Sequence, residues 1–311
     1  KLCTFTWEDG MIADMRFGTN LYRFPSFGPE LQPLIEFVKL SEDFGFERIR
    51  LPDHVVGIIA ERHGGIAETP YTDKSVIREV FTLMAYLPAI TSRITFVPAV
   101  IGLPQRQTVL AAKQAAEVDI LSGGRLVLGV AIGYNALEFR AMGFEFSDRA
   151  KRFEEQIDVM RRLWTSADVS YEGVYHNFVD VSLSPLPIQR PIPLYFGLGR
   201  RIAPIPPDAV LKRIGRLADG WFPIFKPDAE GRKAVDTMRA AAVEAGRDPD
   251  RIVMEMTLDT TGMDAAQIRD EILKRRDFGV DVINFSLPGA TAAEHIDALK
   301  RLKETLDSAA N

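Results

Sequence analysis

Two neighbouring residues, Asp53 and His54, offer the side chains best suited to proton transfer. An imidazole takes up or releases a proton near neutral pH, as the reduction of a carbonyl or the oxidation of an alcohol requires. His54 is one of four histidines, and a buried hydrogen bond that tethers a loop is the alternative role for such a residue. Asp53 could orient His54, accept a hydrogen bond from a cofactor ring N–H, or cap the next helix. The pair is the first candidate for a site that moves protons.

Glycines in two segments could let the backbone approach a planar ring or a phosphate closely. Gly129 and Gly133 stand in GVAIGYN, and Gly197 and Gly199 stand in FGLG. Such spacings are also common in ordinary turns, and the GxGxxG dinucleotide fingerprint is absent from the sequence. The glycines therefore indicate a binding site only in combination with the elements that position them.

Short apolar or β-branched runs alternate with stretches of helical periodicity, a pattern typical of βα units around a parallel sheet. Strands are expected at residues 15–21, 48–51, 94–100, 126–130, 193–197, 220–223, 252–258 and 282–287. Helices are expected around residues 31–38, 81–87, 111–118, 148–164, 208–218 and 229–245. Capping-box patterns, Asp264 with Gln267 and Thr291 with Glu294, open two more helices. The sequence predicts an α/β fold, a (β/α)8 TIM barrel.

Two insertions interrupt this alternation, after strands two and four. The first, residues 57–72, has no assigned role, and the second, residues 169–191, is polar and turn-rich with two β-prone runs that predict a hairpin. His176 in the hairpin could line the mouth of a pocket, but a solvated position is the expectation. Since no shift in composition marks a boundary, residues 15–311 are expected to form one domain, preceded by an N-terminal extension, residues 1–14.

The barrel class indicates where chemistry is to be sought, because active sites lie past the C-terminal ends of the barrel strands. Asp53 and His54 follow strand two, and Pro98 within strand three predicts a distortion there. The other segments in the same position are residues 99–102, residues 131–135 with Glu138 one helical step further, and residues 197–200. We expect these segments to converge on one site.

Composition and charge narrow the classes of function. Hydrophobic residues make up 46% and charged residues 26% of the chain, which is ordinary for a globular protein with a large core. The net charge of -5 provides no basic surface for nucleic acid. Cys3 is the single cysteine, so no internal disulfide and no zinc-ligand spacing exist, and a reducing cytoplasm is expected. Without zinc-ligand spacing no metal is expected. No apolar run reaches the ~18 residues that span a bilayer, so no membrane partner is expected either.

The sequence resembles the luciferase-like monooxygenase superfamily of flavin- and deazaflavin-dependent oxidoreductases. The resemblance covers roughly residues 15–223, and its segments fall in the family's order at similar distances. They are MRFGTNL, ERIRLPDHV, SRITFVPAVIGLPQRQ, EVDILSGGRLVLGVAIGYNALEFRAMG, RAKRFEEQIDVMRRLW, VSYEGVYHNF, LSPLPIQRPIPLYFGLG and RLADGWFPI. Each segment is weak alone, but together they are specific.

The resemblance implies a barrel whose pocket holds an isoalloxazine or deazaflavin ring against strands three, four and five. It implies that the Asp-His pair lies beside the ring and that a non-prolyl cis peptide follows strand three, at about Ala99-Val100. The implied cofactor-binding residues are Asp53, His54, Ala99, Val100, Gly129, Ala131, Gly133, Asn135, Gly197, Leu198 and Gly199. The loop after Gly199 departs from the family's small residues, which leaves the contacts to the cofactor tail open. A small-molecule substrate and a homodimer are also implied.

Within the superfamily, the hairpin and the GYNALEF stretch are most similar to the branch that uses the deazaflavin coenzyme F-420. We therefore expect an oxidoreductase that transfers a hydride between F-420 and a small organic substrate, with His54 as the proton donor or acceptor. Three alternatives stay open. They are an FMN-dependent monooxygenase that uses oxygen, a catalytically silent flavin-binding protein, and a lyase or hydrolase that uses Asp53 and Glu138 without a cofactor.

Overall fold

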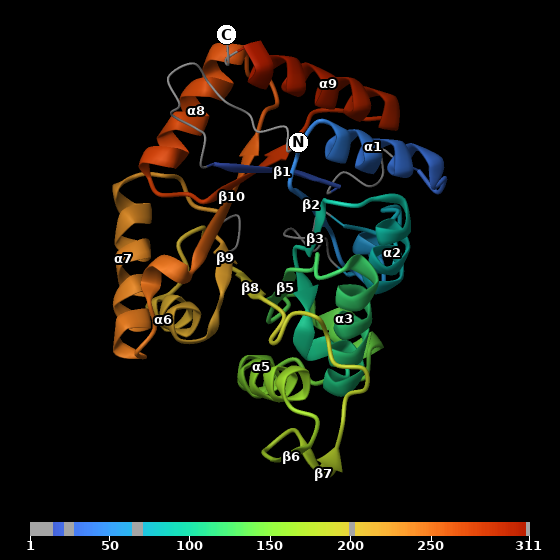
Figure 1. Cartoon of the computed structure of the whole chain (residues 1–311), viewed down its shortest axis with the longest axis vertical. Helices are drawn as coiled ribbons and strands as arrows, with labels where there is room; N and C mark the ends of the chain where they lie inside the picture. The colour runs from blue at the N-terminus through green and yellow to red at the C-terminus, as the bar shows by residue number, and fades with distance from the viewer. Residues whose placement is uncertain (1–14, 22–27, 64–70, 199–202, 309–311) are drawn as a thin grey trace. The chain divides into compact units, whose positions relative to one another are not determined.

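The computed structural model describes residues 15–21, 28–63, 71–198 and 203–308, which fall into two compact units (Figure 1). Unit 1 comprises the described parts of residues 1–51, 93–95 and 195–311, and unit 2 comprises those of residues 52–92 and 96–194. The predicted extension, residues 1–14, lies outside the described residues. The single domain expected for residues 15–311 stays a prediction.

Unit 1 is built on a parallel sheet with the strand order β2-β1-β11-β10-β9-β8. Its strands are β1 (Arg16–Asn20), β2 (Arg48–Leu51), β8 (Leu194–Gly197), β9 (Gly220–Phe222), β10 (Val253–Asp259) and β11 (Val282–Ser286). Each strand falls within or beside the range expected from its apolar run. Most of their residues are buried, as expected of a parallel sheet that is covered on both faces.

Helices alternate with these strands as predicted. They are α1 (Gln32–Asp43), α6 (Asp208–Leu217), α7 (Ala229–Glu244), α8 (Ala265–Asp277) and α9 (Ala292–Ser308). The capping box before α8 is confirmed, since Asp264 and Gln267 exchange hydrogen bonds of 2.8 and 2.9 Å. The second capping box differs by one residue, because the Glu294 carboxylate accepts from the backbone N–H of Ala290, 2.6 Å away, instead of that of Thr291.

Unit 2 carries β3 (Thr95–Pro98), β4 (Ile101–Gly102) and β5 (Leu128–Ala131), with β4 and β5 paired in parallel. The distortion predicted at Pro98 is confirmed, because strand three ends there and resumes only at Ile101. The predicted hairpin is also confirmed as the antiparallel pair β6 (Val169–Glu172) and β7 (Asn177–Val181). The helices of unit 2 are α2 (Val80–Tyr86), α3 (Thr108–Ser122), α4 (Ala136–Ala141) and α5 (Arg149–Thr165).

Helix α5 joins the hairpin to the rest of unit 2, and Figure 1 shows the hairpin beside this helix. The apolar face predicted from Phe153, Ile157 and Met160 is buried. The indole N–H of Trp164 donates to the carbonyl of Ala112 in α3, at 3.0 Å, so the two helices are held together by a buried polar contact as well as by packing.

Within the described ranges, every helix falls short of the length and hydropathy that a bilayer-spanning segment needs. The same ranges contain no group of three or more His, Cys, Asp or Glu side chains arranged to hold a metal ion.

A buried ion cluster that the sequence analysis did not anticipate lies among the strands of unit 1. Glu255 of β10 is fully buried and accepts from Arg48 at 2.9 Å and from Arg50 at 2.6 Å. Arg50 also donates to the Thr257 hydroxyl at 2.8 Å and stacks over the Phe222 ring at 4.4 Å. Although burial opposes its charge, Arg48 has a raised pKa because the Glu255 carboxylate lies beside it. One carboxylate thus holds two buried cations.

Replacing this carboxylate should destabilise the protein strongly. In Glu255→Gln both guanidinium groups stay buried without a counter-charge, so we expect the free energy of unfolding to fall by about 3–5 kcal/mol. Chemical denaturation measures the change. The exposed Glu244 provides the matched control, since Glu244→Gln should change the free energy by less than about 0.5 kcal/mol. Equal, small effects of the two substitutions would contradict this account.

Candidate active site

Asp53 lies directly after β2, at the start of unit 2, with only 7% of its surface exposed. The Arg106 guanidinium donates to Asp53 Oδ1 at 2.7 Å and lies 3.6 Å from the carboxylate of Glu79. Asp53 Oδ2 is buried and makes no hydrogen bond within the described part of the chain. Burial raises the pKa of the Asp53 carboxyl, and the charge of Arg106 only partly opposes this effect.

The imidazole of His54 is held by a buried carboxylate. Its Nδ1 lies 3.1 Å from Oε2 of Glu138, whose other oxygen accepts from the backbone N–H of Val55 at 2.6 Å. Glu138 is 2% exposed, and burial alone would raise its pKa. Hydrogen bonds from His54, the Val55 N–H and the Gln105 side chain outweigh burial and lower that pKa.

The lowered pKa of Glu138 determines which nitrogen of His54 carries the proton. An ionised carboxylate only accepts hydrogen bonds, so Nδ1 of His54 is the protonated nitrogen that donates to it. In the neutral imidazole this leaves Nε2 as the basic atom. The assignment follows from the hydrogen-bond network of the two side chains.

Two tyrosines flank the imidazole on its other sides. The hydroxyl of Tyr134 lies 3.3 Å from Nε2 of His54, and its ring meets the imidazole edge to face at 5.8 Å between centroids. The ring of Tyr71 lies 4.7 Å away at a tilt of 46°. Tyr134 is 45% exposed, so the basic nitrogen of His54 lies toward the accessible side of unit 2.

Helix α4, which the sequence analysis did not predict, places Glu138 against His54. Asn135 caps this helix, because its side-chain oxygen accepts from the backbone N–H groups of Leu137 and Glu138 at 3.1 and 3.3 Å. Gly133 precedes the cap with a φ of +75°, and a Cβ there would lie 2.7 Å from the ring of Phe139. The turn and its packing are thus sufficient to require glycine at this position.

Asp53 and His54 lie together with Glu138 in unit 2, and the other predicted site residues are distributed over the two units. The cis peptide expected between Ala99 and Val100 is confirmed. Gly129 and Ala131 belong to β5, in unit 2, whereas Gly197 ends β8 and Leu198 follows it, in unit 1. Gly199 lies outside the described residues. No described contact tests the cofactor role of these residues, which stays a prediction.

Several side chains of the site were not identified from the sequence. They are Gln105, Arg106 and Tyr71. Tyr134 lies within the candidate segment 131–135, and Glu138 was named one helical step beyond it and as an acid–base group of a lyase or hydrolase. Gln105 and Arg106 follow strand three in GLPQRQ, so their position at a strand end was the available signal. Asp53 is bound to Arg106 and Glu138 to His54. This pairing argues against the lyase or hydrolase alternative, which needs two carboxylates facing each other.

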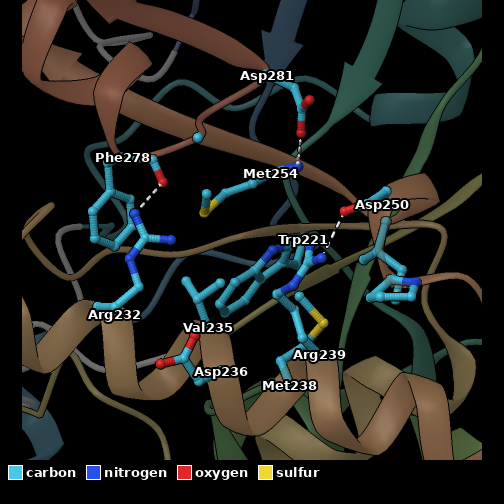
Figure 2. Close-up of a pocket in the computed structure, with 13 residues that line it drawn as sticks. Trp221, Arg232, Val235, Asp236, Met238, Arg239, Asp250, Met254, Phe278 and Asp281 are labelled. Atoms are coloured by element: carbon cyan, nitrogen blue, oxygen red, sulfur yellow. Dashed lines mark hydrogen bonds and ion pairs between the residues drawn. The ribbon is translucent and has the colours of Figure 1, made fainter.

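Unit 1 contains a cavity of about 270 Å³ whose polar side chains serve structure and not acid–base chemistry. It lies at the N-terminal ends of β10 and β11, and Figure 2 shows Trp221 among the side chains of α7 that line it. Arg232 donates to the carbonyl of Phe278 at 2.7 Å, and Asp281 accepts from the backbone N–H of Met254 at 2.7 Å. These polar groups connect neighbouring elements, as is usual at the stability face of a barrel.

The charge of Glu138 should make stability depend on pH. The pKa of Glu138 in the folded protein lies below its value of about 4.3 in the unfolded chain. The ionised carboxylate therefore contributes fully to the free energy of unfolding above about pH 4.3, and this contribution is lost as the pH falls through the pKa of the folded state. We expect Glu138→Gln to lose about 1–3 kcal/mol of unfolding free energy at pH 7, with the difference from the native protein shrinking below about pH 4. Urea denaturation across this pH range measures the difference in unfolding free energy between the variant and the native protein. Glu304→Gln is the control, because Glu304 is exposed. A difference that does not change with pH would contradict this prediction.

Comparison with known proteins places this geometry in context. The model of the family described as luciferase-like monooxygenase matches residues 15–261. An uncharacterized protein of Mycobacterium tuberculosis is 31% identical over 278 residues, which cover 87% of this chain and 81% of the relative. An FMNH2-dependent dimethylsulfone monooxygenase of Pseudomonas putida is 34% identical over 172 residues, 54% of this chain and 45% of that protein. An F420-dependent glucose-6-phosphate dehydrogenase of Amycolatopsis mediterranei is 30% identical over 203 residues, which cover 63% of this chain and 54% of that protein.

Solved structures show the same fold. The monooxygenase RslO1 of Streptomyces bottropensis superposes with a TM-score of 0.75 at 21% identity, over 94% of this chain and 98% of that chain. The coenzyme F420-dependent tetrahydromethanopterin reductase of Methanopyrus kandleri superposes with a TM-score of 0.72 at 18% identity, over 96% and 100%. This likeness confirms the (β/α)8 TIM-barrel class that the sequence predicted.

Proposed function

Since the chain belongs to the luciferase-like monooxygenase family, we propose that it is an oxidoreductase that transfers a hydride between coenzyme F-420 and a small organic substrate. Relatives and a structural neighbour are named as an FMNH2-dependent monooxygenase, an F420-dependent dehydrogenase and an F420-dependent reductase, and the chain is an enzyme of this flavin- or F420-dependent class. An F420-dependent dehydrogenase and an F420-dependent reductase among them support the choice of cofactor.

The observation that carries the proposal is the hydrogen bond between His54 and Glu138. The carboxylate holds the proton on Nδ1, so Nε2, beside the Tyr134 hydroxyl, is the basic atom that takes the proton of a substrate hydroxyl when an alcohol is oxidised. In the reverse direction, protonated His54 gives that proton to a carbonyl oxygen, and the charge of Glu138 stabilises the imidazolium. When bound, the deazaflavin supplies the hydride chemistry itself.

Asp53 has the chemistry that a flavin or deazaflavin ring requires. Its Oδ2 is a buried acceptor that makes no hydrogen bond to any described residue, and such an atom is costly to leave unpaired. A ring N–H is a suitable donor for it, so we assign Asp53 to the ring edge and His54 to the substrate side. The other residues proposed to contact the cofactor are Ala99, Val100, Gly129, Ala131, Gly133, Asn135, Gly197, Leu198 and Gly199.

An FMN-dependent monooxygenase is the second candidate. The relative from Pseudomonas putida supports it, because that protein is named FMNH2-dependent and is 34% identical over the matched part. The residues around His54 do not distinguish the two rings, since each ring carries an N–H group that would suit the free acceptor of Asp53. We further propose a homodimer, from the family resemblance, and a cytoplasmic location, because the chain has a single cysteine.

The choice between the two cofactors is tested by binding. The purified protein is titrated with F-420 and, separately, with FMN, and the fluorescence of each ring is followed. We expect saturable binding of F-420 with weaker binding of FMN. Tight binding of FMN without binding of F-420 would overturn the proposal and favour the monooxygenase.

The role of His54 is tested by substitution. His54→Ala removes the basic nitrogen, so we expect turnover to fall by about 10²–10⁴-fold while the affinity for the cofactor changes little. The matched control is His63→Ala, because His63 is exposed in the 3-10 helix Ala60–His63. Turnover that is the same in both variants would contradict the acid–base role of His54. Cofactor binding without turnover in the native protein and in both variants would instead indicate a protein that only binds the cofactor.

A further inference from the structure

We propose that Gln156 of α5 is a positioning residue for the acid–base site, an inference that rests on the proposed function. Gln156 holds the loop 103–106, which presents Gln105 and Arg106 to the site carboxylates Glu138 and Asp53. A chain of hydrogen bonds through the hairpin β6–β7 holds Gln156 in turn. Through Gln156, the second insertion therefore helps to hold the loop 103–106 against the site.

The contacts of Gln156 all lie on one stretch of chain. Its side chain is fully buried, and Nε2 lies 3.2 Å from the carbonyl oxygens of Leu103 and Arg106 and 2.9 Å from the hydroxyl of Thr108. An amide has only two N–H groups, so these three acceptors share them. Both ends of the loop 103–106 are thereby tied to the middle of one helix.

The side chains of this loop reach the site. Arg106 donates to Asp53 at 2.7 Å, and the side-chain hydrogen bond of Gln105 helps to lower the pKa of Glu138. Gln105 is 3% exposed and packs against Gly102, where a Cβ would lie 3.0 Å from its side-chain carbon. A shift of the loop would therefore move a hydrogen-bond partner of each carboxylate, and the placement of His54 depends on Glu138.

A second set of hydrogen bonds fixes Thr108. His176 of the hairpin is bonded to the Thr108 hydroxyl through Nε2 at 2.6 Å and to the Glu155 carboxylate through Nδ1 at 2.8 Å. Glu155 also accepts from three backbone N–H groups of the hairpin, at 2.8–2.9 Å. Although burial acts against it, these bonds lower the pKa of Glu155. The expectation that His176 is solvated was wrong, because its side chain is only 10% exposed.

Along the path from Gln156 through Thr108 and His176 to Glu155, each group donates a hydrogen bond to the next. Ionised Glu155 accepts from Nδ1–H of His176. In the neutral imidazole, Nε2 of His176 then accepts from the Thr108 hydroxyl, and the oxygen of Thr108 accepts from Gln156. Every donor therefore has an acceptor. Such a network restricts Gln156 to one rotamer, whereas an apolar side chain at the same place would fill the space without holding the loop.

Two substitutions remove the support at different points. Gln156→Leu removes the donors to the loop, and Thr108→Val removes the shared hydroxyl at nearly constant volume. Thr108→Ser keeps the hydroxyl and should restore the native behaviour. Ser170→Ala is the control within the hairpin, because the hydroxyl that it removes is bonded, among the described residues, to Asp180, with distances of 3.0 and 3.2 Å.

The readout that does not need the cofactor is the ¹⁵N NMR spectrum of the His54 ring in ¹⁵N-histidine-labelled protein, assigned with His54→Ala. We expect Gln156→Leu and Thr108→Val to change the Nδ1 and Nε2 shifts of His54, because Glu138 no longer holds one tautomer. Turnover should fall about 10-fold or more with the same substitutions. Thr108→Ser and Ser170→Ala should match the native protein in both measurements.

The proposal is overturned if folded Gln156→Leu and Thr108→Val retain native His54 shifts. It is also overturned if both variants unfold, since the network would then serve stability alone. Failure of the proposed function is distinguishable, because a protein without F-420 turnover still yields the His54 spectrum. Circular dichroism separates folded from unfolded variants before either measurement.

Discussion

The candidate site depends on one constraint, that a buried carboxylate must have its oxygens bonded. Glu138 is almost fully buried and remains ionised only because three groups donate to it. These donors come from His54 and Val55 after β2 and from Gln105 after β4. The same bonds that stabilise the charge therefore bring the two loops and helix α4 into one arrangement.

Glu255 and Asp53 are buried carboxylates with different partners, and Oδ2 of Asp53 makes no hydrogen bond within the described residues. Glu255 is bound by two arginines and Asp53 by one, and an arginine keeps its charge throughout the physiological pH range. The partner of Glu138 is a histidine, which changes its charge near neutral pH. Of these pairs, the one with histidine is therefore suited to acid–base chemistry, and the arginine pairs are suited to maintaining structure.

The hairpin and α5 extend this arrangement away from the reacting groups. Glu155 and His176 form a second carboxylate–imidazole pair in unit 2, but Nε2 of His176 is bonded to Thr108 within the protein. The pair around His54 has the exposed hydroxyl of Tyr134 at the corresponding nitrogen. The two carboxylate–imidazole pairs of unit 2 thus have different roles. They differ in whether Nε2 of the imidazole lies toward the accessible side, as in His54, or is enclosed within the protein, as in His176.

The sequence by itself determined the βα alternation, most element bounds and the hairpin, because the periodicity of apolar residues is a local property. It also placed Asp53 and His54 at a strand end. Helix α4, of six residues, is too short for periodicity to reveal. The tertiary structure alone decided the partners, since Glu138 lies 84 residues from His54 and Thr108 lies 68 from His176. A pattern along the chain shows which face of an element is buried, but the charged group that meets it there is set by how distant elements pack.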